Sequence, residues 1–116
     1  MLKVIIAGSR TFDDYELLKQ KCDLFLKQHS DIEIVSGNAK GADKLGELYA
    51  KEKRYKIKQF IPDWKQHGKQ AGIIRNIDMG DYANALIAFW NGRSRGTKFM
   101  IEYAEKKGLQ VRVVRF

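Results

Sequence analysis

The segment Leu2-Lys3-Val4-Ile5-Ile6-Ala7-Gly8-Ser9-Arg10 decides the fold class of this chain. It is a short apolar run that ends at a glycine-containing turn. A second such run, Ala85–Trp90, ends at Asn91-Gly92. Strands that are apolar at successive positions are typical of parallel sheets with both faces covered. The two runs therefore predict central strands of a buried parallel sheet.

Strand-like and helix-like segments alternate along the whole chain. The predicted strands are Leu2–Ala7, Ile32–Ser36, Tyr55–Ile61, Ala85–Trp90 and Val111–Phe116. The predicted helices are Asp13–Gln28, with Asp13 and Glu16 placed as a capping box, then Ala42–Lys53, Lys69–Tyr82 and Thr97–Lys107. Strict alternation indicates a three-layer, doubly wound, Rossmann-like α/β fold with helices on both faces of a parallel sheet.

The composition of the strands also predicts their order. Lys56–Phe60 and Val111–Arg115 alternate partly between polar and apolar residues, which suits edge strands. With the first and fourth strands at the centre, the five-stranded order is 3-2-1-4-5. We expect one domain over residues 1–116, since this length suits a single core. Ligands of such sheets bind beyond the strand carboxyl ends, where the strand order reverses.

The composition excludes several classes of protein. A single Cys excludes a disulfide framework, and one Cys with two His excludes a Cys/His zinc site, so no metal is expected. No apolar run is long enough to span a membrane, and the first apolar run is too short for a signal peptide. We therefore expect a cytoplasmic protein with no membrane partner. The net charge of +8 permits nucleic-acid or phosphate partners.

Glycine-containing loops follow the predicted strands and lead into helices. They are Gly8–Thr11, Ser36–Asp43, Asp63–Lys69 and Asn91–Thr97. Helix N-termini favour anions, and glycines allow a close backbone approach, so the loops predict phosphate binding at one edge of the sheet. The alternative is that the glycines serve tight turns only. The standard phosphate motifs G-x-x-x-x-G-K-[ST] and G-x-G-x-x-G are absent, which disfavours ordinary P-loop and dinucleotide-binding enzymes.

Short motifs in these loops match known proteins. Ser36–Asp43 resembles the S-G-x-A-x-G-x-D element of DprA-type DNA-processing proteins, and Ala7–Arg10 resembles their G-S-R turn. Arg75–Met79 and Asn84–Phe89 together resemble a segment of the LOG (lysine-decarboxylase-like) phosphoribohydrolases. With Trp64, Gly68, Ala71-Gly72 and Ser94–Thr97 added, the chain is most similar to the single-domain YspA-like branch of the SLOG superfamily.

The resemblance implies a nucleotide or nucleotide-derived ligand, bound by a sensor or by an enzyme that cleaves an N-glycosidic bond. The LOG enzymes carry P-G-G-x-G-T-x-x-E, whose Glu works with an Arg that Arg75 matches. Met100 stands in place of that Glu, and the first carboxylate is Glu102. Catalysis and binding alone therefore both stay open, with Arg75 and Glu102 as catalytic candidates and no required cofactor. The resemblance also implies a homodimer.

The loops and motifs together predict one ligand-binding set. Its members are Gly8, Ser9, Arg10, Ser36, Gly37, Lys40, Gly41, Asp43, Trp64, Arg75, Asn76, Trp90, Asn91, Gly92, Ser94, Arg95, Gly96 and Thr97. Structural alternatives exist for some of them. The alternative for Arg75 is a structural ion pair with Asp43. The alternative for Asp43 is stabilisation of the N-terminus of the helix in which it lies. For Glu102 the alternative is an exposed pair with Lys98 or Lys106.

Trp64 and Trp90 have two interpretations as well. Their rings suit stacking on a base, or they cover the end of the sheet or a subunit interface. The first functional hypothesis is therefore a domain that binds a nucleotide-like small molecule. The alternative is a DprA-like module for single-stranded DNA, based on Ser36–Asp43 and the net charge.

Overall fold

The computed structural model describes all 116 residues and contains a five-stranded, all-parallel sheet. Its strands are β1 (Leu2–Gly8), β2 (Ile32–Ser36), β3 (Lys56–Gln59), β4 (Ala85–Trp90) and β5 (Gln110–Arg115). The order is β3-β2-β1-β4-β5, which confirms the predicted order. Val4 of β1 lies opposite Ala85 of β4 and opposite Ile34 of β2. β1 is therefore the centre of the sheet.

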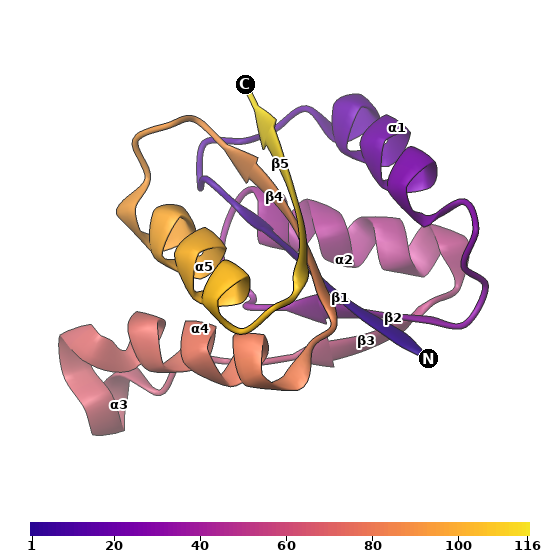
Figure 1. Ribbon diagram of the computed structural model, residues 1–116. Helices are drawn as coiled ribbons and strands as arrows, with labels where there is room; N and C mark the ends of the chain where they lie inside the picture. Colours follow the sequence, from indigo (N-terminus) through magenta and orange to yellow (C-terminus); the bar gives the residue numbers. More distant parts are fainter.

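The helices form a layer on each face of the sheet (Figure 1). Helices α1 (Tyr15–Leu26) and α2 (Ala42–Lys53) cover one face, and α4 (Ala71–Tyr82) and α5 (Arg95–Lys106) cover the other. A single helical turn, α3 (Trp64–His67), and a 3₁₀ turn, Gly68–Gln70, precede α4. This three-layer arrangement confirms the Rossmann-like fold class.

The central strands are buried on both faces. Val4 and Ile6 pack with the α1 and α2 side, while Ile5 and Ala7 pack with the α4 and α5 side. Val4, Ile5 and Ile6 are completely buried, and each contributes about 1.5–3 kcal/mol to folding through its burial. The apolar run that opens the chain is thus explained by two hydrophobic layers meeting on one strand.

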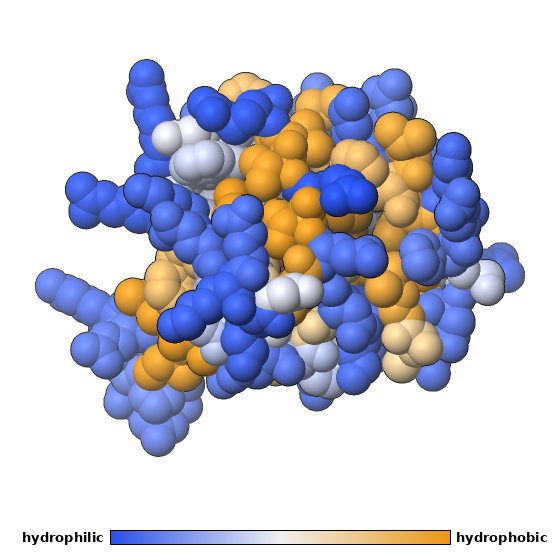
Figure 2. All heavy atoms as spheres, in the orientation of Figure 1, coloured by the Kyte–Doolittle hydropathy of each residue, from blue (hydrophilic) through white to orange (hydrophobic).

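The edge strands are more exposed, as their alternating composition predicts. All residues of β3 and β5 are partly or fully exposed. Val113 and Phe116 are among the exposed large apolar residues of the chain. Figure 2 shows apolar side chains gathered over β4 and β5, between α5 and α1. Only the centre of the sheet is therefore closed to solvent.

Two predicted starts of helices are each wrong by two residues. Helix α1 begins at Tyr15, and its cap is Asp14 rather than Asp13, because an Asp14 oxygen accepts a hydrogen bond from the Leu17 N–H at 3.1 Å. Helix α5 begins at Arg95 rather than Thr97, because Ser94 provides the cap. Short polar residues adjacent to each start compete for the cap position, and the tertiary structure selects one of them.

The region between β3 and α4 also differs from the prediction. β3 ends at Gln59 instead of Ile61, and α4 begins at Ala71 instead of Lys69. The separate turn α3 is capped by Asp63, whose side chain accepts from the Gln66 N–H at 3.0 Å. Gly68 ends this turn with a φ of +58°. That conformation suits glycine and separates α3 from the next turn.

Because every strand is parallel, the two ends of the chain lie at opposite ends of the sheet (Figure 1). The N-terminal ammonium lies 3.6 Å from a carboxylate oxygen of Asp31. At the other end, the rings of Phe116 and Phe12 have centroids 4.8 Å apart. None of the helices combines the length and apolar character that crossing a membrane requires.

Candidate functional site

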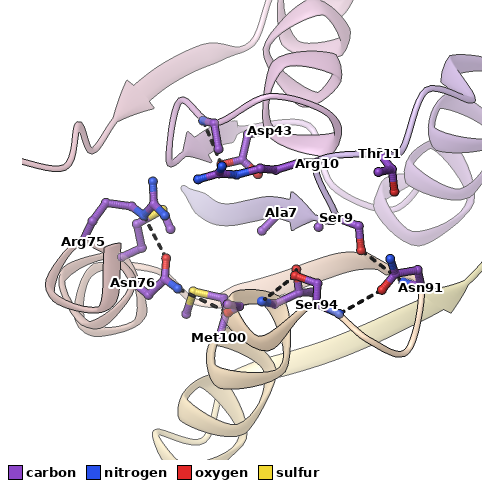
Figure 3. Close-up of a pocket in the computed structure, with 15 residues that line it drawn as sticks. Ala7, Ser9, Arg10, Thr11, Asp43, Arg75, Asn76, Asn91, Ser94 and Met100 are labelled. Atoms are coloured by element: carbon purple, nitrogen blue, oxygen red, sulfur yellow. Dashed lines mark hydrogen bonds between the residues drawn. The ribbon is translucent and has the colours of Figure 1, made fainter. Parts of the chain in front are cut away.

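A cleft of about 420 Å³ opens at the carboxyl edge of the sheet (Figure 3). It lies where the loops after β1 and β4 diverge toward opposite helix layers, the position expected for a ligand site in this fold. Ten of the predicted binding residues line it: Gly8, Ser9, Arg10, Asp43, Arg75, Asn76, Asn91, Ser94, Gly96 and Thr97. The fold therefore brings together residues from four separate segments of the chain.

Gly8 and Ser9 fix the floor of the cleft. A Cβ atom on Gly8 would overlap the carbonyl oxygen of Phe89 and lie 2.8 Å from Cβ of Ala42. Ser9 is buried, its N–H donates to the Phe89 carbonyl at 2.9 Å, and its Oγ accepts from the Asn91 N–H at 3.2 Å. The loops after β1 and β4 are thus joined at the bottom of the cleft.

The loop after β4 is folded around polar side chains. The Oδ1 atom of Asn91 accepts from the N–H groups of Arg93 at 2.8 Å and Ser94 at 2.9 Å. Ser94 Oγ then caps α5 through the Thr97 N–H at 3.4 Å. The Gly96 N–H, in the first turn of α5, donates no hydrogen bond within the chain. This loop therefore presents a helix N-terminus to the cleft, an arrangement that favours an anion.

Arg75 reaches the cleft from α4 and is held by neutral partners. Its Nη1 donates to the Gly37 carbonyl at 2.6 Å, and its Nε donates to Oδ1 of Asn76 at 2.8 Å. The Nδ2 of Asn76 donates to the Gly96 carbonyl at 3.3 Å, which connects α4 to α5. Arg75 has no ion pair with Asp43, the structural alternative noted above. Neutral oxygens therefore orient the guanidinium group, and no carboxylate is in ion-pair contact with it.

Asp43 lies buried beneath the rim of the cleft. Its Oδ2 accepts from the Ala39 N–H at 3.2 Å instead of capping α2, which has Gly41 at its cap position. Burial raises the pKa of Asp43 to about 6, although the Ala39 hydrogen bond and the charge of Arg75 both act to lower it. This carboxylate is thus only weakly acidic.

Arg10 supplies the second positive charge. It extends from the loop after β1 across Asp43 toward Arg75 (Figure 3). The pKa of Arg75 is lowered, first by burial and also by the positive charge of Arg10, while Asp43 acts to raise it. Two guanidinium groups therefore converge on the cleft near the Asp43 carboxylate, which forms an ion pair with neither of them.

The loop after β2 is shaped by hydrogen bonds behind the cleft. Ser36 is buried, and its Oγ donates to Glu47 at 2.6 Å and accepts from the Asn38 N–H at 3.1 Å. Gln59 also donates to Glu47, at 3.2 Å. Ser36, predicted as a ligand contact, therefore lies behind the cleft and supports the loop that holds Gly37.

A smaller hollow of about 260 Å³ adjoins the cleft. It is lined by Gly37, Lys40 and Trp64 of the predicted set, and it shares Arg10, Ala39 and Arg75 with the cleft. The two hollows therefore adjoin at the two arginines.

Other predicted residues lie outside both hollows. The indole N–H of Trp90 donates to the Ser94 carbonyl at 3.0 Å, and the Arg115 guanidinium lies 5.2 Å from its ring centroid. Gly92, with a φ of +83°, packs against Arg115, Gly41 lies behind the rim, and Arg95 is exposed at the start of α5.

The catalytic candidate Glu102 also lies outside. It is exposed on α5 and makes no ion pair, whereas Met100, two residues earlier, is buried and lines the cleft. Met100 lies three residues beyond Thr97 and Glu102 lies five residues beyond it, so their side chains are on different faces of the helix.

Five lining residues were not in the predicted set: Ala7, Thr11, Ala39, Met79 and Met100. Met79 follows Arg75 by four residues and Met100 follows Thr97 by three, so helical spacing alone would have placed them beside predicted residues. Ala39 and Thr11 adjoin predicted loop residues directly. No group of three or more His, Cys, Asp or Glu side chains is arranged to hold a metal ion.

The sequence and the fold of this chain are similar to those of known proteins. The chain is 34% identical over 118 residues to the Gene 61 protein of Mycobacterium phage D29, covering 96% of this chain and 94% of that protein. Its fold matches the crystal structure of DNA processing protein A (DprA) from Streptococcus pneumoniae with a TM-score of 0.81 and 20% identity. That match covers 100% of this chain but 51% of the DprA chain, and it is a likeness of fold.

A family model identifies the group. Residues 2–67, more than half of the chain, match the model of the YspA, cpYpsA-related SLOG family. This stretch extends from β1 through α3 and includes the turn after β1 and the loop after β2. The relative from the mycobacteriophage extends the likeness over nearly all of the sequence. The chain belongs to the YspA, cpYpsA-related SLOG family.

Proposed function

We propose that this domain binds a nucleotide or nucleotide-derived ligand in the cleft, with a phosphate group between Arg10 and Arg75. The observation that carries the proposal is the convergence of two guanidinium groups on a cleft where neither has a carboxylate in ion-pair contact. Guanidinium groups bind phosphate through charge-assisted, often paired hydrogen bonds. SLOG domains generally bind nucleotide-derived ligands, which agrees with this chemistry.

Unused backbone donors support the same placement. The N–H groups of Arg10 and Thr11, like that of Gly96, donate no hydrogen bond within the chain, and all three residues line the cleft. Backbone N–H groups at a loop and at a helix N-terminus form an anion site without any further charge. The hydroxyl groups of Ser94 and Thr97 lie beside them and offer neutral contacts for a sugar.

The same geometry favours binding over hydrolysis of the LOG type. Met100 fills the position of the LOG glutamate, and Asp43 is the only carboxylate that lines the cleft. Asp43 already accepts the Ala39 N–H and has a raised pKa. We therefore propose a binding domain that senses its ligand, in preference to an N-glycosidic hydrolase.

The test is the thermal stability of the protein with AMP, ADP-ribose and NAD. A ligand that binds only the folded state raises stability by about 2.7 kcal/mol at one hundred times its Kd. We expect at least one of these compounds to raise the Tm, and we expect Arg75→Ala to weaken its affinity roughly tenfold to a hundredfold.

Arg112→Ala is the matched control, since Arg112 lies on the edge strand β5 and does not line the cleft. It should leave the ligand-induced shift unchanged. The proposal fails if no compound of the panel changes the Tm, or if both arginine variants respond alike.

A second candidate is single-stranded DNA, favoured by exposed basic residues in and next to the segments that follow β1, β2, β3 and β4. They are Arg10, Lys40, Lys65, Lys69, Arg93 and Arg95. Binding of this kind weakens steeply with salt, because phosphate contacts release counterions. Fluorescence anisotropy of a labelled oligothymidylate at 50 and 200 mM salt distinguishes the candidates. Absence of binding at the lower salt would exclude DNA.

A further inference from the structure

The two edges of the sheet differ in how well they are protected. Unpaired N–H and C=O groups at a sheet edge bind other strands, and a short strand or charged side chains usually prevent this. The edge strand β3 has four residues, two of which are the exposed Lys56 and Lys58. The other edge strand, β5, has six residues, three of which are valines, and none of the six is buried. β5 is therefore the less protected edge.

The hydrogen bonds between β5 and β4 show which backbone groups face outward. The N–H of Gln110 donates to the Asn84 carbonyl at 3.2 Å, so the backbone of the even-numbered residues of β5 faces β4. Because these groups alternate in direction along a strand, the N–H and C=O groups of Val111, Val113 and Arg115 point away from the sheet. Val113 is the central residue of the three, and it is 41% exposed.

The two arginines of β5 are held against aromatic rings of their own chain. The Arg112 guanidinium lies 5.9 Å from the ring centroid of Phe25 in α1, and the Arg115 guanidinium lies 5.2 Å from that of Trp90. Cation–π contacts of this kind hold the two charges over opposite faces of the sheet. Figure 2 shows apolar side chains gathered over β4 and β5. The edge is therefore apolar between its two charges.

A second copy of β5 matches this edge in an antiparallel arrangement. With a two-fold axis at Val113, the outward-facing residues of one strand lie opposite those of the other. Val113 then lies opposite itself, and Arg115 lies opposite Val111. Arg112 lies opposite Val114, so no arginine faces another arginine, an arrangement that would be destabilising.

Helix α5 has a charge pattern that suits the same axis. Lys98, Glu102 and Glu105 are exposed, form no ion pair within the chain and follow one another at helical spacings of four and three. Tyr103 faces α4, where its hydroxyl donates to Asp81 at 2.6 Å, so this charged stripe lies on the side of α5 away from α4, toward the β5 edge. A two-fold axis places the basic end of one stripe beside the acidic end of the other.

We propose that two copies of this chain associate by antiparallel pairing of their β5 strands about Val113, which joins their five-stranded sheets into one. The charged stripes of the two α5 helices pair across the same axis. An extended segment of another protein would use the same backbone groups but would not match the stripe. The proposal does not depend on the ligand of the cleft, because no residue of β5 or of the stripe lines it.

The first test is the association constant of the intact protein, measured by sedimentation. Val113→Lys places two ammonium groups opposite one another at the axis, and we expect it to raise the dissociation constant of the dimer about tenfold. Leu48→Lys is the matched control, since Leu48 is 43% exposed on α2, and it should leave the dimer unchanged. Circular dichroism checks that both variants are folded.

A cross-link tests the register directly. Hydrogen-bonded residues of an antiparallel pair have Cα atoms about 5.5 Å apart, within the range of about 4.4–6.8 Å that a disulfide requires. The native Cys22 is buried and does not compete. Val113→Cys should form a disulfide-linked dimer on mild oxidation, and Leu48→Cys should not.

The charged stripe provides a rescue experiment. Lys98→Glu should weaken the dimer, and mixing it with the double variant Glu102→Lys and Glu105→Lys should restore association as a mixed dimer.

A protein that is monomeric at every concentration overturns the proposal. A dimer that tolerates Val113→Lys as well as Leu48→Lys, or that does not cross-link through Val113→Cys, assigns association to another surface and also overturns it. The nucleotide-induced change in Tm is measured separately, so neither result decides the proposed function.

Discussion

Positively charged side chains have different partners at the two ends of the sheet. At the amino end and on the helices leading to it, cations pair with carboxylates of the same chain. Lys53 lies 3.1 Å from Asp23, and Lys19 lies 3.5 Å from Glu52. At the carboxyl end, Arg10 and Arg75 converge without an ion pair, and Arg75 is held by neutral oxygens.

This difference shows that the distribution of charge is more informative than its total. The basic run Lys51–Lys58 is the densest in the sequence, yet its basic side chains are exposed around the far end of the sheet. Exposed pairs there contribute little to stability and are screened by salt. The arginines of the cleft are fewer, but a bound anion would be their principal partner. The net charge of +8 is thus divided between a solvated surface and the proposed binding site.

The largest effect is expected from Gly8→Ala, because β1 and β4 pack closely at Gly8, at the floor of the cleft. The new Cβ would overlap the Phe89 carbonyl, so β1 and β4 must move apart. Overpacking of this kind costs typically about 1–3 kcal/mol, and more where backbone must shift. The free energy of unfolding, measured by urea denaturation, should fall by at least about 2 kcal/mol.

Gly96→Ala is the control for this change, because a Cβ at Gly96 meets nothing within 4 Å. It should retain the stability of the parent protein. A Gly8→Ala protein as stable as Gly96→Ala would show that the cleft floor is not closely packed.

An intermediate effect is expected from Asp43→Asn, and it depends on pH. Because burial raises the pKa of Asp43 to about 6 from its ordinary 3.8, the folded state binds more protons than the unfolded state between these values. The free energy of unfolding therefore falls as the pH rises from about 4 to about 6. Asn stays neutral, so this decline should disappear in the variant.

The opposite end of the sheet provides the contrasting carboxylate. Burial acts to raise the pKa of Asp23, but hydrogen bonds from Tyr49 and Lys53 outweigh burial, so this pKa lies below its ordinary value. The ionised Asp23 therefore contributes to stability above its ordinary pKa, and this contribution is lost as the pH falls. Urea denaturation of Asp43→Asn and Asp23→Asn between pH 3 and 8 should show slopes altered in opposite directions. Identical pH profiles would contradict the assignment.

The smallest effect is expected from Lys53→Met at the far end. The ion pair with Asp23 is exposed, so its loss should lower the Tm slightly at low salt and not measurably at 0.5 M salt. The nucleotide-induced shift should be the same as in the parent protein. A loss of ligand response would mean that the far end contributes to binding after all.

The sequence predicts the fold well because its strongest signals are those of the core. The apolar runs Leu2–Ala7 and Ala85–Trp90 occupy central strands, and the alternating runs occupy the edges. The breaks between elements are harder to predict, because Asp13 and Asp14 are equally good caps in sequence and only the fold selects Asp14.

The candidate site is predictable in its loops and less so in its walls. Ser9 and Asn91 lie together because the carboxyl ends of β1 and β4 are neighbours, and Arg75 reaches the same cleft from α4. Met79 and Met100 read as ordinary core residues, and their other contacts are indeed in the core. The exclusion of Glu102 from the cleft depends on a rotation of about 100° per residue around α5, which places it on the exposed side.

The position of the chain ends has a practical consequence for all of these measurements. Phe116 lies on Phe12, close behind the loop that carries Arg10, at the same edge of the sheet as the cleft. A purification tag or surface anchor attached after Phe116 would emerge beside the proposed binding site and compete with or mask its ligand. The same appendage before Met1 would emerge at the far edge, next to Asp31. Immobilised assays of this protein should therefore be built on the amino terminus.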